Sequence, residues 1–114
     1  MRHGDNEWCA WIRKRAEREY AATLPHYVYC VSDGHGKIKI GITGNIEQRI
    51  KQLKHANPDI KLNSYITTKN RASAFETEGA LHELAYQHHI SGEWYNKGAE
   101  EIFNDLKKIT ENLK

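Results

Sequence analysis

The sequence is poor in cysteine and proline, and it has no long run of apolar residues. Its only cysteines, Cys9 and Cys30, lack the CxxC spacing of a zinc ribbon, and they leave a disulfide open without implying one. Its apolar stretches are only a few residues long, so they are too short for a signal peptide or a membrane span. We therefore expect a cytoplasmic, intracellular protein with no membrane partner.

The apolar and aromatic residues that are present suffice for one folded unit. At 114 residues, of which 39% are hydrophobic, the chain is long enough for one compact domain with a modest core. The net charge of +2 hides an uneven distribution, because residues 36–71 contain far more basic than acidic side chains. The basic ones are Lys37, Lys39, Arg49, Lys51, Lys54, Lys61, Lys69 and Arg71, against Glu47 and Asp59. Such a region suits a phosphate backbone, although lysines also solvate any small domain.

Residues 26–43 predict a β-hairpin with a glycine-rich turn. Its first arm is rich in valine and tyrosine, which favour strands, and its second arm alternates between isoleucine and other residues. If the isoleucines are buried with Val28 and Cys30, then Tyr29 and Lys39 lie together on the other, open face of the sheet. The arms are residues 26–32 and 37–43.

A capped helix follows the hairpin. Asn45 can accept a hydrogen bond from the first turn of a helix whose apolar positions are Ile46, Ile50 and Leu53. Arg49 lies at the edge of this apolar stripe. A phenol, an ammonium and a guanidinium could therefore converge on one anion. The alternative is a strand tyrosine accompanied by ordinary surface cations.

The whole pattern predicts an α/β (α+β) fold, a small three-stranded antiparallel sheet flanked by helices. Residues 1–24 would be an N-terminal extension and residues 25–114 the main domain. The extension contains an amphipathic helix over 6–22, whose stripe would either pack against the domain or form a homodimer or DNA-contacting surface. That stripe consists of Trp8, Trp11, Ile12, Ala16 and Tyr20. Three further elements are predicted. A strand at 61–67 has Leu62, Ser64 and Ile66 on one face, and a helix at 71–89 has Phe75, Leu81 and Ala85 inward. A last helix at 98–113 has an apolar stripe of Ile102, Phe103, Leu106, Ile109 and Leu113.

Glu78 falls on the inward stripe of the helix at 71–89. A glutamate in an apolar stripe is costly unless it is paired or binds a cation. We therefore expect Glu78 to be a metal ligand, and the alternative is a buried ion pair with Arg49 or Lys39. His82 lies one turn further along on the same face, where it could orient the carboxylate, bind the metal or be a core histidine.

The order of these features resembles the GIY-YIG nuclease superfamily. The branch that it resembles has KIG in place of YIG, followed by Ile/Val-Thr, and a downstream GEW motif followed by an aromatic residue. The resemblance covers about residues 26–97. The residues that carry it are Tyr27-Val28-Tyr29, Lys39-Ile40-Gly41, Arg49 on the following helix, Glu78 with His82 four residues later, and Gly92-Glu93-Trp94-Tyr95.

The resemblance implies a metal-dependent endonuclease that hydrolyses phosphodiester bonds in DNA. Tyr29 would be the general base, Arg49 would bind the phosphate, and Glu78 would hold Mg²⁺ or Mn²⁺. The ammonium of Lys39, in place of the second tyrosine, would favour the phenolate form of Tyr29. The expected partner is DNA, and the protein would be nucleoid-associated when bound to it.

Further residues are expected to assist this chemistry. The supporting residues are Tyr27, His82 and Asn96, and the DNA-binding residues are Lys37, Lys51 and Lys54. The alternative reading is a non-catalytic nucleic-acid-binding or protein-interaction module on the same GIY-YIG-like fold.

Overall fold

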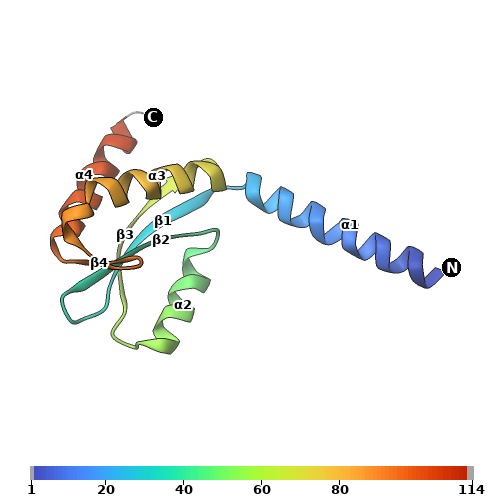
Figure 1. Ribbon diagram of the computed structural model, residues 1–114, viewed down its shortest axis with the longest axis horizontal. Coiled ribbons are helices and arrows are strands. Elements are labelled where there is room, and N and C mark those ends of the chain that lie inside the picture. Colours follow the sequence, from blue (N-terminus) through green and yellow to red (C-terminus); the bar gives the residue numbers. More distant parts are fainter. Residues whose placement is uncertain (1, 113–114) are drawn as a thin grey trace.

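The structure is a computed structural model that describes residues 2–112, with side chains described for residues 9–112. Its elements alternate short strands with helices along the chain (Figure 1). They are α1 (Arg2–Thr23), β1 (His26–Ser32), β2 (Lys37–Thr43), α2 (Ile46–Ala56), β3 (Lys61–Thr68), α3 (Arg71–Leu84), the 3₁₀ turn η1 (Tyr86–His88), β4 (His89–Ser91), β5 (Trp94–Asn96) and α4 (Gly98–Asn112).

The sheet has five antiparallel strands in the order β3-β1-β2-β5-β4, so the expectation of three strands is wrong. The hairpin of β1 and β2 and the strand β3 have nearly the predicted bounds. The two missed strands have only three residues each and are joined across Gly92, whose φ of 53° suits a tight turn. They begin where the predicted helix at 71–89 was expected to end and overlap it only at His89, since α3 ends at Leu84 and η1 follows it.

Helices cover both faces of the sheet. Figure 1 shows α3 and α4 on one side of the strands and α2 on the other. The predicted burial of Val28, Cys30, Ile38 and Ile40 on one face is confirmed, and that face packs against α3 and α4. The main core consists of Val28, Cys30, Ile38, Ile40, Ile66, Ala74, Leu81, Ala85, Tyr95, Ala99 and Phe103.

Two of the predicted helical stripes need correction. Phe75 is 54% exposed, and Ala74 takes the inward position on α3 instead, one turn before Glu78. On α4, Phe103 is buried but Ile109 is exposed, because it lies off the inward side of the helix, on which Leu106 and Thr110 are half-buried. Leu113 lies outside the described residues.

The predicted alternation in β3 fails at a bulge. Cys30 of β1 pairs with Ser64, but the next residue, Val31, pairs with Leu62, so Asn63 is an extra residue in β3. Leu62 consequently packs with Val31 on the α2 face rather than with Ile66 on the other face.

Helix α1 projects away from the domain, so the expectation that its stripe packs against the sheet and helices is wrong (Figure 1). Trp11, Ile12 and Tyr20 are exposed along it, and only a few contacts join α1 to α3. The side chain of Trp8 lies outside the described residues. None of the described helices combines the length and apolar character needed to cross a membrane.

Candidate active site

The site is built around the close approach of Tyr29 to Gly41. These residues are paired across β1 and β2, and a Cβ atom on Gly41 would lie 2.5 Å from the phenol oxygen of Tyr29. Any larger residue at position 41 would therefore displace the ring. Tyr29 is only 1% exposed because Ile46 and Ile50 of α2 pack over it, so the expectation of an open sheet face at Tyr29 is wrong.

Arg49 is the cation that contacts this phenol. Its Nε donates a hydrogen bond of 3.2 Å to the Tyr29 hydroxyl, and its Nη1 donates one of 3.3 Å to Gln52 Oε1. The start of α2 is fixed by Asn45, whose side-chain oxygen accepts a 3.0 Å bond from the backbone N–H of Gln48, as predicted. This cap sets the helical phase that turns Arg49 toward the sheet.

The pKa of Tyr29 is raised above its ordinary value of 10.0. Burial is the largest cause, and it outweighs the hydrogen bond and the positive charge of Arg49, which lower the pKa. The carboxylates of Glu93 and Glu78 raise it further. The expectation that Lys39 lowers the pKa of Tyr29 is therefore wrong, and the phenol is protonated at neutral pH.

Lys39 forms an ion pair with Glu93, at a distance of 3.7 Å between Nζ and Oε2. The pairing of β2 with β5 sets Lys39 opposite Trp94, and its ammonium lies 5.6 Å from the centre of the Trp94 ring. The backbone carbonyl of Glu93 also accepts a 3.1 Å hydrogen bond from Ile40. Glu93 is a site residue that sequence reasoning missed. The GEW motif contains it, but its role depends on a strand pairing that was not expected.

Glu78 is largely buried and lacks a suitable partner. Its side chain is 13% exposed, and no described residue forms a hydrogen bond with its Oε2 atom. His82 is its ion-pair neighbour, with Nε2 at 3.9 Å from Oε2. Burial lowers the pKa of His82, so at neutral pH its ring does not offset the carboxylate charge. Within residues 9–112, the alternative of an ion pair from Glu78 to Arg49 or Lys39 is wrong.

The burial of Glu78 raises the pKa of its carboxyl, and the neighbouring charge of Glu93 raises it further. Although α3 and α2 cover opposite faces, the charge of Glu78 also acts on Tyr29. Among the described residues, β5 pairs with β2 along Lys37–Lys39, and past the bond from Ile40 to Glu93 no strand adjoins this edge of β2. We call Tyr29, Lys39, Arg49, Glu78 and Glu93 the Tyr29 site.

Of the expected supporting residues, His82 lies beside the Tyr29 site and Asn96 does not. His82 is next to Glu78, and its ring lies 5.4 Å from that of Tyr95. Asn96 lies apart, because its side-chain oxygen is 2.9 Å from His88 Nδ1 and accepts a 2.9 Å bond from the backbone of Gly98, at the start of α4.

The expected DNA-binding lysines are all exposed, outside the Tyr29 site. Lys37 lies at the hairpin end of β2, two residues before Lys39, while Lys51 and Lys54 project from α2. Tyr27 lies two residues before Tyr29 and faces an open cleft.

Glu78 is the residue of this site that could hold a divalent metal. The described residues contain no group of three or more histidine, cysteine, aspartate or glutamate side chains arranged to bind one. A zinc-type cage is therefore not formed by this part of the chain. The buried, unpartnered carboxylate oxygen of Glu78 does fit Mg²⁺, which keeps several waters and is often held by one or two carboxylates.

Replacing Gly41 tests the packing of the phenol. We expect Gly41→Ala to destabilise the protein by about 1–3 kcal/mol, because the new methyl group collides with a buried ring. Gly79→Ala is the matched control. Its Cβ would meet no atom within 4 Å and would lie in helix α3, so it should stabilise by up to ~1 kcal/mol. Urea unfolding followed by circular dichroism measures both, and equal effects would contradict the described packing.

Comparison with protein families gives one match, and searches of the curated proteins and of the solved structures each found none. The match is to the T5orf172 domain, over residues 25–112, and therefore covers every residue of the Tyr29 site. This domain is found in GIY-YIG-like and nuclease-associated proteins, and the GIY-YIG family itself gives no direct match. The chain belongs to the T5orf172 domain family.

Proposed function

We propose that this protein is a metal-dependent endonuclease of the GIY-YIG type, which hydrolyses phosphodiester bonds in DNA. One observation carries the proposal. The Oε2 atom of Glu78 is buried without a hydrogen-bond partner among the described residues, and the charge of this carboxylate raises the pKa of a phenol that is itself bonded to an arginine. An acid, a phenol and a guanidinium are the groups that phosphodiester hydrolysis needs. The T5orf172 match, to a domain found in nuclease-associated proteins, agrees with this assignment.

Each group has a role that suits its chemistry. The guanidinium of Arg49 has N–H donors to spare for a phosphate besides the bond to Tyr29. Glu78 would hold Mg²⁺ or Mn²⁺, and the bound metal supplies positive charge at the phosphate and the leaving oxygen. Tyr29 would accept the proton of the attacking water. Its raised pKa makes it a strong base that is rarely deprotonated at neutral pH.

Lys39 and Glu93 set the charge around these groups. Their ion pair leaves the ammonium only partly exposed, and it lies against the ring of Trp94. A phosphate at the site would offer Lys39 a second anionic partner. We therefore assign Lys39 to phosphate binding rather than to lowering the pKa of Tyr29.

A non-catalytic nucleic-acid-binding module is the second candidate. The exposed Lys51 and Lys54 on α2 would contact a phosphate backbone in either case. Incubation with supercoiled plasmid, with Mg²⁺ or Mn²⁺ and with EDTA, separates the two. Metal-dependent nicking supports the nuclease, whereas a gel shift without nicking supports the binding module.

Glu78→Gln should abolish nicking and yet stabilise the fold. The variant loses the metal ligand but also removes a buried, unpartnered charge, so we expect a gain of about 1 kcal/mol, or roughly 4–8 °C in Tm. Because the folded pKa of Glu78 is raised above 4.5, this gain is absent below about pH 4.5 and grows as the pH rises through the folded pKa. Mg²⁺ should raise the Tm of the wild type and not that of the variant.

Glu76→Gln is the matched control, since Glu76 lies on the exposed side of the same helix. It should change neither nicking nor Tm. A Glu78→Gln protein that nicks plasmid as fast as the wild type would show that Glu78 is not the metal ligand.

The pH dependence of cleavage tests Tyr29 as the base. Because burial keeps its pKa above 10.0, the nicking rate should rise with pH between about pH 7 and pH 9. Tyr29→Phe should reduce the rate about 10²–10⁴-fold and flatten this rise. A variant that keeps the wild-type profile would assign the base to another group.

Helix α1 is proposed to form a homodimer contact. Most of the stability of helices in proteins comes from packing of an apolar face, and α1, a helix of 22 residues, leaves Ile12 and Tyr20 exposed. Sedimentation equilibrium of the full chain should give a dimer, and Ile12→Glu combined with Tyr20→Glu should give a monomer. Glu17→Lys, at another exposed position of α1, is the control and should leave the mass unchanged. A monomeric wild type at micromolar concentration would leave α1 free for other partners, DNA among them.

A further inference from the structure

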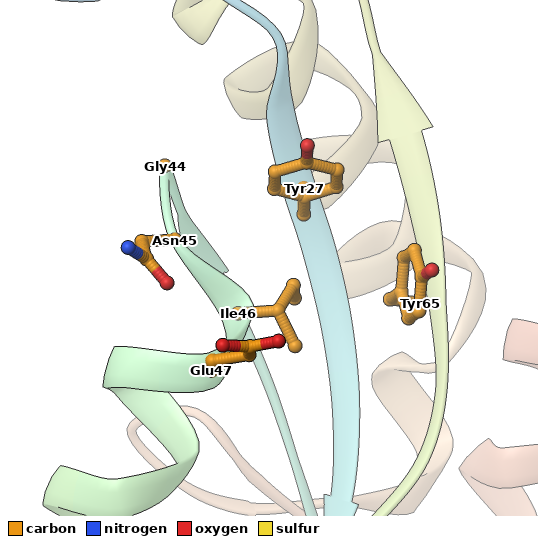
Figure 2. A pocket seen from close by; sticks show the side chains of 6 residues that line it. All are labelled: Tyr27, Gly44, Asn45, Ile46, Glu47 and Tyr65. Atoms are coloured by element: carbon orange, nitrogen blue, oxygen red, sulfur yellow. The ribbon is translucent and has the colours of Figure 1, made fainter.

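We propose that a cleft beside the Tyr29 site binds an unpaired nucleobase, so that the substrate is nucleic acid with unstacked nucleotides rather than perfectly paired duplex. The cleft lies between the first turn of α2 and two tyrosines on the sheet (Figure 2). This inference rests on the proposed function, because the base belongs to the strand whose phosphate Arg49 would bind.

The cleft is large enough for a nucleotide. Its volume is about 550 Å³, and it is open to solvent on the face of the sheet that α2 covers only in part. Figure 2 shows the two rings on neighbouring strands and the polar side chains across from them. The lining residues are Tyr27, Gly44, Asn45, Ile46, Glu47 and Tyr65.

The two tyrosine rings offer a stacking surface. Tyr27 and Tyr65 are perpendicular, with an interplanar angle of 84° and ring centres 5.8 Å apart, so a flat ligand can stack on one ring and meet the edge of the other. Tyr65 is 41% exposed. The ammonium of Lys107 lies 5.8 Å from the centre of this ring and donates a 3.0 Å bond to the neighbouring Ser64. Aromatic rings held in an open cleft bind single-stranded nucleic acid without need for base pairing.

The opposite wall supplies polar groups for the edge of a base. The side-chain oxygen of Asn45 accepts a bond from the backbone of Gln48, and within residues 9–112 its amide N–H groups have no partner, so they can donate to a ligand. Among the described residues, none forms a hydrogen bond with the carboxylate of Glu47, which can accept one from an exocyclic amino group. A donor next to an acceptor matches the edge of an unpaired base, whereas a paired base has these groups already occupied.

The cleft and Arg49 are placed so that one strand of nucleic acid could contact both. Glu47 and Arg49 are two positions apart on α2, so they flank the helix on opposite sides, with Ile46 and Ile50 packed onto the sheet between them. Tyr27 and Tyr29 are two residues apart on β1, or ~6.6 Å along the strand. A strand that passes over the start of α2 would therefore present a phosphate to one flank and a base to the other. In stacked duplex the base could not leave its neighbours without an unstacking cost.

Fluorescence anisotropy in EDTA tests the inference without cleavage. The probes are a fluorescein-labelled 12-nucleotide strand, the same strand paired with its complement, and a strand of equal length in which abasic residues replace the bases. We expect Tyr65→Ala to weaken binding of the single strand roughly fivefold to a hundredfold, the range for loss of one stacked base. Binding of the duplex should change less than about twofold, and the abasic strand should bind the wild type as weakly as the intact strand binds Tyr65→Ala.

Two controls guard against misfolding and general effects. Tyr65→Phe keeps the ring and should bind the single strand like the wild type. Tyr86→Ala removes an exposed tyrosine outside the cleft and should also leave binding unchanged. Thermal unfolding of each variant establishes that Tyr65→Ala is folded, and if it is not, Tyr27→Leu replaces it with the same expectation.

The outcomes separate this inference from the nuclease proposal. If Tyr65→Ala binds the single strand as tightly as the wild type, or if the abasic and intact strands bind alike, the nucleobase site is overturned even when plasmid is nicked. If single-strand binding depends on Tyr65 while metal-dependent nicking is absent, the nucleobase site stands and the nuclease proposal fails.

Discussion

The contact on which the rest of the site depends is that of the Tyr29 phenol with Gly41 beneath it and Arg49 beside it. The missing side chain of Gly41 lets a large aromatic ring lie flat across the centre of the sheet. The ring then provides the surface on which Ile46 and Ile50 of α2 pack. Because α2 is held in this way, its arginine faces the phenol rather than solvent. The lack of a side chain at Gly41 is thus required both for the packing of α2 and for the placement of Arg49.

The features of this site that arise within a single strand or helix can be predicted from the sequence. The hairpin, the Asn45 cap and the inward position of Glu78 follow from local rules, namely strand alternation, capping and helical periodicity, and the structure agrees with all three. These rules operate over a few residues, so they can be read from a single chain. They also predict which residues share a face, as the burial of Val28 and Cys30 illustrates.

The remaining features depend on contacts between segments that are distant in the sequence, which local rules do not describe. Strands β4 and β5 are too short to show alternation, and without them Glu93 has no reason to approach Lys39. The bulge at Asn63 moves Leu62 to the other face of β3 with no local signal. The pKa of Tyr29 was expected to fall because of a nearby lysine, but burial decides its direction, and burial depends on the whole fold. Predictions of pKa shifts therefore fail more readily than predictions, from strand or helix periodicity, of which residues share a face.

The short hairpin of β4 and β5 has a consequence for the cation that it restrains. Each of these strands has three residues, and β5 pairs with β2 along Lys37–Lys39, with one further backbone bond from Ile40 to Glu93. The ladder is short, but Tyr95 of β5 is buried in the main core and anchors the hairpin there. Glu93 lies in the turn of the same hairpin, so the counter-ion of Lys39 is positioned by a residue that belongs to the core. A substitution that loosened Tyr95 would therefore also disturb the charge balance beside the phenol.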